Sequence, residues 1–190
     1  MPGGVVLFAG GRDPLEAGPG AVLTLLIDAM TKFGFSHTAL AMPAAGVTAP
    51  YIHESTIRDG VSGPQRSDLN ACLAECRKQG GHARLFPFLP QFEPDWADAE
   101  AAALQLISER EQGRMPYNVE RLFADAEERS WVFDVVALPA DGVISYLAAH
   151  SKGIVYSEMV GLLAQAGGVV ARLTAVGIPG CRRSHHQASR

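Results

Sequence analysis

The chain has 190 residues, of which 47% are hydrophobic, and carries a net charge of −4. A chain of this length can bury one hydrophobic core of ordinary size, so we expect one domain. The 16 lysines and arginines are scattered along the sequence and form no basic stripe, which argues against nucleic acid as a partner.

The N-terminal residues lack the features of a targeting segment. They have no basic region and only a short apolar stretch, so we expect no signal peptide. The longest apolar run, residues 21–30, is interrupted by Thr24 and Asp28 and is well short of the roughly 20 residues that a membrane-spanning helix needs. The three cysteines do not form a disulfide framework and suit a reducing compartment. A cytoplasmic or virion location without a membrane span is therefore expected.

The first predicted elements alternate between strands and a helix. Residues 5–8 are short, apolar and β-rich, which predicts a buried strand. Residues 21–32 have apolar side chains on one helical face. Residues 36–42 and 51–57 flank a loop that is rich in proline and glycine, which predicts two adjacent antiparallel strands with a long turn.

The middle of the chain predicts two helices and one strand. Ser67 is a plausible N-cap for a helix over residues 68–76, which two glycines then terminate. Residues 83–89 predict a third strand of the same sheet. Pro94 and Asp95 open a helix to about residue 111 that is rich in good helix formers.

The C-terminal part adds further elements. Residues 119–129 and 142–150 are predicted helices, and residues 131–138 are predicted to be extended. Residues 157–166 have a strong apolar face and end at two glycines, which predicts an amphipathic helix with Ser157 as its cap. The predicted fold class is α+β, with an antiparallel sheet packed against helices.

Five short motifs occur in an order that is typical of one family. They are Val5-Val6-Leu7-Phe8, Ser36-His37, Glu54 followed by Gly60-Val61, Gly113 with Pro116-Tyr117, and Tyr156-Ser157-Glu158 at the start of an apolar helix. In this order they resemble the circularly permuted NlpC-type papain-like hydrolases, relatives of lecithin-retinol acyltransferase. The resemblance implies a permuted papain-like domain over residues 1–168, which leaves residues 169–190 as a C-terminal extension.

The resemblance also implies a catalytic arrangement. Such a site needs a thiolate at a helix N-terminus, an imidazole beside it and a polar group that orients the imidazole. Carried over, His37 is the base, Glu54 or alternatively His53 is the orienting group, and Tyr156 occupies the nucleophile position. A phenol with a pKa of about 10 is a poor nucleophile at neutral pH. Ser157 is a substitute, but one helical step of about 100° turns it away from an imidazole placed for Tyr156.

Neither the cysteines nor the histidines suggest another site. Cys72 and Cys76 are four residues apart on a predicted amphipathic helix, so at least one is expected in the core, and neither is expected near the predicted site. Together with Cys181, His185 and His186 they lack the spacing of a structural zinc site. We expect no metal and no cofactor.

Two functions from different classes remain open. The first is a papain-like domain that has lost thiol catalysis and binds other subunits of a larger assembly, such as a phage virion. The second is an active amidase, peptidase or acyltransferase on cell-wall peptides or lipid amides and esters, with His37 and a nucleophile other than cysteine. Tyr156 favours the first. In that case His37 is a structural hydrogen-bonding residue, and Glu54 is alternatively a solvated strand residue.

Overall fold

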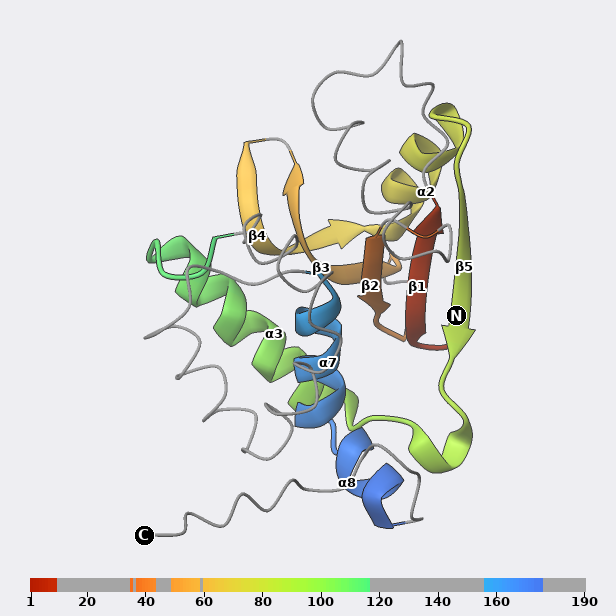
Figure 1. Ribbon diagram of the computed structural model, residues 1–190, viewed down its shortest axis with the longest axis vertical. Coiled ribbons are helices and arrows are strands. Elements are labelled where there is room, and N and C mark those ends of the chain that lie inside the picture. The colour runs from red at the N-terminus through yellow and green to blue at the C-terminus, as the bar shows by residue number, and fades with distance from the viewer. Residues whose placement is uncertain (10–34, 36, 44–48, 59, 117–155, 176–190) are drawn as a thin grey trace, which may run out of the picture.

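The computed structural model describes residues 1–9, 35, 37–43, 49–58, 60–116 and 156–175. These residues form an α+β structure in which helices lie on both faces of a five-stranded antiparallel sheet (Figure 1). The predicted helix at residues 21–32 and the elements predicted between residues 119 and 150 lie outside the described residues.

The sheet has the strand order β4-β3-β2-β1-β5. Its strands are β1 (Gly4–Ala9), β2 (His37–Ala41), β3 (Tyr51–Arg58), β4 (Val61–Asp68) and β5 (His82–Pro87). The first three strands predicted from the sequence are confirmed as β1, β2 and β3, and the last two are antiparallel neighbours as expected. The strand predicted over residues 83–89 is β5, which ends at Pro87 and pairs with β1 at the sheet edge.

Strand β4 is absent from the sequence prediction because its residues do not show the apolar alternation of a half-buried strand. It contains Gly63 and Pro64, and Pro64 is tolerated because β4 is an edge strand. Gly63 has a φ of 110°, and a Cβ atom there would collide with the backbone carbonyl of Met115. Glycine at this position therefore allows the β4 backbone to lie against the segment that follows helix α3.

The described helices are α2 (Leu69–Lys78), α3 (Trp96–Glu111), α7 (Tyr156–Ala166) and α8 (Val169–Ala175), with a 3-10 turn η1 (Pro90–Phe92). The Asp68 side chain caps α2 by accepting a hydrogen bond from the backbone N–H of Ala71 at 2.8 Å. The prediction that Ser67 is this cap is wrong, because the Ser67 hydroxyl donates its hydrogen bond to Glu54 of β3 and not to the helix. Helix α7 begins one residue earlier than predicted, at Tyr156.

Strand alternation divides the interior into two apolar clusters. Helices α3 and α7 cover one face, where Leu40 of β2 packs with Leu106, Met159 and Leu163. Helix α2 covers the other face, where its residues pack with β1, β2 and β3; this second cluster consists of Val6, Phe8, Ala39, Ala41, Ile52, Leu69 and Cys72. Each face of the sheet thus has its own helical cover.

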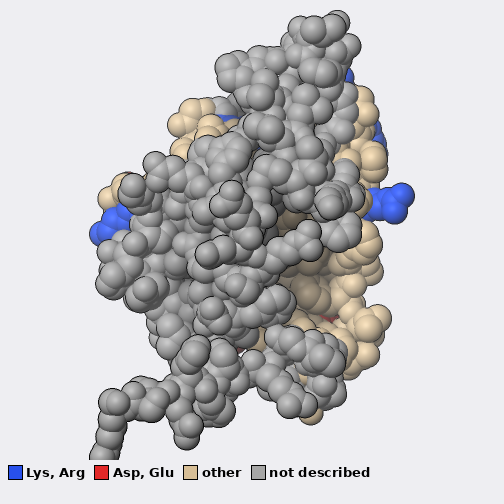
Figure 2. Space-filling view, in the orientation of Figure 1, with Lys and Arg blue, Asp and Glu red and all other residues tan. Residues whose placement is uncertain are grey.

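The first residues of the predicted C-terminal extension are helical. They form α8, whose Val169 is buried, and Arg172 donates to the backbone carbonyl of Gly167 at 2.8 Å. Residues 176–190 lie outside the described residues. Among the described residues, no helix is both long and apolar enough to cross a bilayer. Figure 2 shows the lysines and arginines of the described residues, drawn in blue, in separate places on this face.

Candidate functional site

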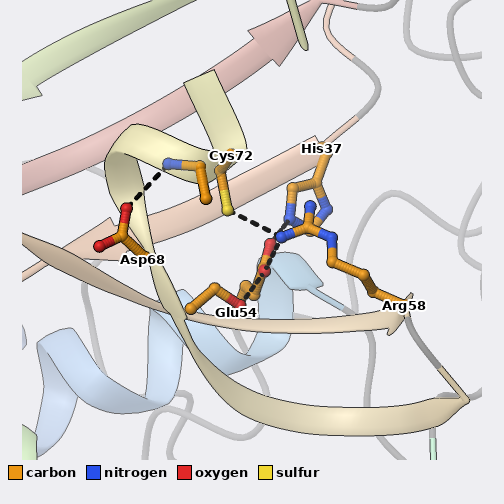
Figure 3. A network of polar contacts seen from close by, with 7 residues as sticks. His37, Glu54, Arg58, Asp68 and Cys72 are labelled. Atoms are coloured by element: carbon orange, nitrogen blue, oxygen red, sulfur yellow. Dashed lines mark hydrogen bonds and ion pairs between the residues drawn. The ribbon is translucent and has the colours of Figure 1, made fainter. Parts of the chain in front are cut away.

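The structure brings His37 and Glu54 together. His37 opens β2, Glu54 lies in the middle of β3, and the imidazole Nε2 is 2.6 Å from the carboxylate Oε2 (Figure 3). A carboxylate can only accept a hydrogen bond, so Nε2 carries the proton in this pair. His37 is 17% exposed and Glu54 is 0% exposed. The base and the orienting group inferred from the resemblance are therefore in direct contact.

Two more side chains donate to the other oxygen of the Glu54 carboxylate. Arg58 Nη1 lies 2.8 Å from Oε1, and the Ser67 hydroxyl lies 2.6 Å from the same atom. Burial alone raises the pKa of Glu54, but the hydrogen bonds and charges of His37, Arg58 and Ser67 together lower it below its ordinary value. Glu54 is thus a buried, ionised carboxylate, and its interpretation as a solvated strand residue is wrong.

Helix α2 contributes a thiol to this network. Cys72 is 5% exposed, and its Sγ accepts a hydrogen bond from Arg58 Nη1 at 2.7 Å, the same nitrogen that binds Glu54. The expectation that Cys72 lies away from the site is therefore wrong, whereas its burial in the core is confirmed. One feature of the sequence could have predicted the contact between Arg58 and Glu54. Arg58 is four residues after Glu54 in the same strand, so strand alternation places both side chains on one face of the sheet.

The Cys72 thiol is not activated. Its burial raises the pKa, the charge of Glu54 raises it further, and Arg58 only partly opposes both effects. Cys76, one helical turn later, also has a pKa raised by burial. Since the thiolate is the reactive form of cysteine, a raised pKa makes both described cysteines poorer nucleophiles than an ordinary thiol.

His53, the alternative orienting group, lies on the opposite face of the sheet from Glu54. Its Nε2 is 2.7 Å from Glu100 Oε2 of helix α3, and the ring is 0% exposed. Burial lowers the pKa of His53, while the hydrogen bond and charge of Glu100 act against this effect. The structure therefore gives the two neighbouring residues different partners, and only Glu54 contacts His37.

The nucleophile position lies at the N-terminus of α7, where Tyr156 and Ser157 occupy the first turn. Their side chains are outside the described residues, so a contact of either with His37 stays a prediction. The described part of α7 packs against the face of the sheet that carries Leu40. His37 faces the other way, because it pairs with Phe8 of β1 and their rings lie 5.7 Å apart in the cluster under α2.

The chemistry available to the pair is that of a base with its orienting carboxylate. A buried carboxylate that holds one ring nitrogen fixes the orientation and tautomer of an imidazole, as in hydrolytic sites. Among the described residues, no three histidine, cysteine, aspartate or glutamate side chains are grouped as a metal site would require. No family model matches the chain, and no curated protein or solved structure matches it.

Proposed function

We propose that this chain is a papain-like domain of the permuted NlpC type that has lost thiol catalysis and serves as a binding module in a larger assembly, such as a phage virion. The observation that carries this proposal is that the thiol beside the His37–Glu54 pair, Cys72, is buried and has a raised pKa. Cys72 is buried, is held by Arg58 and has a raised pKa, so it does not act as the nucleophile.

The packing of α7 supports the same conclusion. The family resemblance assigns the nucleophile to the first residue of this helix, which is Tyr156 here. A phenol is a weak acyl-transfer nucleophile at neutral pH. The described part of α7 also packs on the sheet face opposite to His37. Both features support a site without a competent nucleophile, and a contact of Tyr156 or Ser157 with His37 stays a prediction.

The ligand that we propose for this module is a peptide of the bacterial cell wall. The family resemblance suggests this class of ligand, and peptide groups could meet the partly exposed His37 imidazole. The fully buried Glu54 would act only through His37. Binding at the pair is then expected to depend on both residues, although only one of them can contact a ligand.

A second function is favoured by the geometry of the pair itself. The 2.6 Å contact between His37 and an ionised, fully buried Glu54 is the arrangement that a general base needs. The alternative is therefore an active amidase, peptidase or acyltransferase that uses His37 with a nucleophile other than cysteine.

A combined binding and hydrolysis experiment separates the two functions. Muropeptides are titrated into the full chain by calorimetry, and hydrolysis of muropeptides and simple acyl esters is followed in parallel. We expect binding without hydrolysis, binding weakened by His37→Ala and by Glu54→Gln, and unchanged binding in Glu109→Gln, which alters a surface ion pair on α3. A gain of hydrolysis in Tyr156→Cys would identify a site that has lost its nucleophile.

Two results would overturn the binding proposal. Hydrolysis by the parent chain that His37→Ala abolishes would establish the enzymatic alternative, and Ser157→Ala would then test that hydroxyl. Absence of both binding and hydrolysis would exclude cell-wall peptides as the ligand.

A further inference from the structure

His53 and Glu54 are consecutive residues of β3 whose side chains enter opposite faces of the sheet. Both side chains are 0% exposed. Strand β3 is hydrogen-bonded to β2 on one side and to β4 on the other, with His53 opposite Leu40 and Glu54 opposite Gln65. Because one peptide bond joins His53 to Glu54 within a paired strand, a displacement of the backbone at His53 also displaces Glu54.

The His53 side chain is part of a polar cluster under helix α3. Glu100 Oε2 accepts hydrogen bonds from His53 Nε2 at 2.7 Å and from the Tyr51 hydroxyl at 3.3 Å. Arg66 of β4 lies 3.9 Å from Glu100 Oε1, and its guanidinium stacks 3.5 Å above the Tyr51 ring. One carboxylate of α3 is thus held by three residues of the β3–β4 hairpin.

The second ring nitrogen of His53 makes this cluster sensitive to protons. Nδ1 is buried and has no hydrogen-bond partner within the part of the chain that the structure describes. Nε2 donates to Glu100, so the neutral ring leaves only a lone pair on Nδ1, whereas a second proton would create a buried N–H without an acceptor. Such a group destabilises the fold, because it loses its hydrogen bond to water and gains none in the protein. The lowered pKa of His53 agrees with this argument.

The groups around the His53 ring do not supply the missing acceptor. Among the residues that the structure describes, the titratable and charged groups that face it are Tyr51 of β3, Arg66 of β4 and Glu100 of α3. Helix α7 also packs near β3, and its described side chains, from Met159 to Ala166, contain no titratable group. Glu100 already accepts from Nε2, so the imidazolium would have to turn or admit water.

We propose that the His53–Glu100 pair is a proton-sensitive lock: the neutral pair ties β3 to helix α3, and protonation of His53 releases this contact and moves Glu54 relative to His37. The proposal concerns the coupling, across strand β3, of the polar cluster around His53 and Glu100 with the polar cluster around Glu54 and His37. It holds whether the chain binds or hydrolyses a ligand.

The test uses the full chain with one probe on each face of the sheet. Trp96 opens α3 one turn before Glu100, and a Trp131→Phe background makes it the single tryptophan. The second probe is the 13C resonance of the Glu54 carboxyl. On lowering the pH from about 7.5 until the chain unfolds, we expect both signals to change with one common midpoint below 6.5, the ordinary pKa of histidine, because the pKa of His53 is lowered.

Matched variants assign the transition to His53. His53→Phe and His53→Gln should each remove most of the Trp96 emission change and the part of the Glu54 shift that accompanies it. Glu109→Gln, which removes a carboxylate elsewhere on α3, should respond like the parent. Any Glu54 shift that remains in the His53 variants does not depend on His53.

Three outcomes would overturn the proposal. They are a Trp96 signal that stays constant until the chain unfolds, a transition that persists in a folded His53 variant, and a Glu54 shift that is identical in parent and variant. If neither His53 variant folds, the parent chain alone tests the proposal. Different midpoints for the Trp96 emission and the Glu54 resonance would then contradict a coupled lock.

Discussion

The hydroxyl of Ser67 donates a hydrogen bond to Glu54 Oε1 at 2.6 Å, while the next residue, Asp68, caps helix α2. Two consecutive residues thus connect the end of β4 to the site and to the helix that covers it. The position of α2, and with it the position of Cys72, is tied to the carboxylate that binds His37.

Exchanging these two residues for alanine should produce different defects. Ser67→Ala removes a hydrogen bond to a charged acceptor and should lower the free energy of unfolding by up to about 2 kcal/mol. Asp68→Ala removes a helix cap and should lower it by about 1 kcal/mol. Urea denaturation followed by circular dichroism measures both. Only Ser67→Ala should also raise the pKa of Glu54, and an equal effect of Asp68→Ala on that pKa would contradict the separate roles.

Glu54→Gln should be among the most destabilising exchanges in the site. It removes the charge that Arg58 and His37 contact, and breaking a buried ion pair by removing one partner costs about 3 kcal/mol at the low end of its range. The low end applies because Arg58 and His37 both reach solvent. Urea denaturation is again the measurement. Glu109→Gln, which breaks a surface ion pair with Arg114, serves as the control and should show no resolvable change.

The lowered pKa of Glu54 predicts a specific loss of stability in acid. A carboxyl whose folded pKa lies below its ordinary value of 4.5 stabilises the fold at pH values above 4.5. This contribution is lost as the pH falls from that value through the folded pKa, because the unfolded chain then binds the proton first. Unfolding free energies measured across this window should fall less steeply in Glu54→Gln than in the parent. Parallel curves would show that folding does not lower the pKa of Glu54.

Cys72 should be protected from thiol reagents in the folded chain. It is nearly fully buried, and its pKa is raised by burial, whereas Cys76 is only partly buried. In a Cys181→Ser variant, Ellman's reagent should therefore modify Cys76 first and reach Cys72 only when urea unfolds the chain. Fast modification of Cys72 in a Cys76→Ser, Cys181→Ser variant would instead identify an activated thiol and revive Cys72 as a nucleophile.

Gly60 and Gly63 provide a matched pair that tests the close approach of β4. Both have a positive φ, but a Cβ at Gly60 would meet no atom, while one at Gly63 would meet the Met115 carbonyl. Gly60→Ala should cost about 1–2 kcal/mol from the left-handed backbone alone. Gly63→Ala should cost more, because backbone must also move. Thermal unfolding of both variants compares them, and equal losses would argue against the contact with Met115.

Local patterns in the sequence were sufficient for most regular elements that the structure describes. Strands β1 to β3 follow from short β-rich runs, and α3 and α7 follow from helical periodicity. These signals work because they depend on the residue preferences and the spacing of apolar side chains within one segment. The failures have equally physical causes. Edge strand β4 has too few apolar residues to show alternation, and two adjacent polar residues, Ser67 and Asp68, were equally suited to cap α2.

The sequence by itself also singled out His37 and Glu54, through the order of motifs that resemble one family. Only the tertiary structure decided their surroundings. In the structure, Cys72 lies beside Arg58, and His53 is hydrogen-bonded to Glu100. The described part of α7 packs on the face opposite to His37. The physical reason is that consecutive strand residues point to opposite faces, and the partner of each depends on strand register and on the helix that covers that face. Neither is encoded in any single segment.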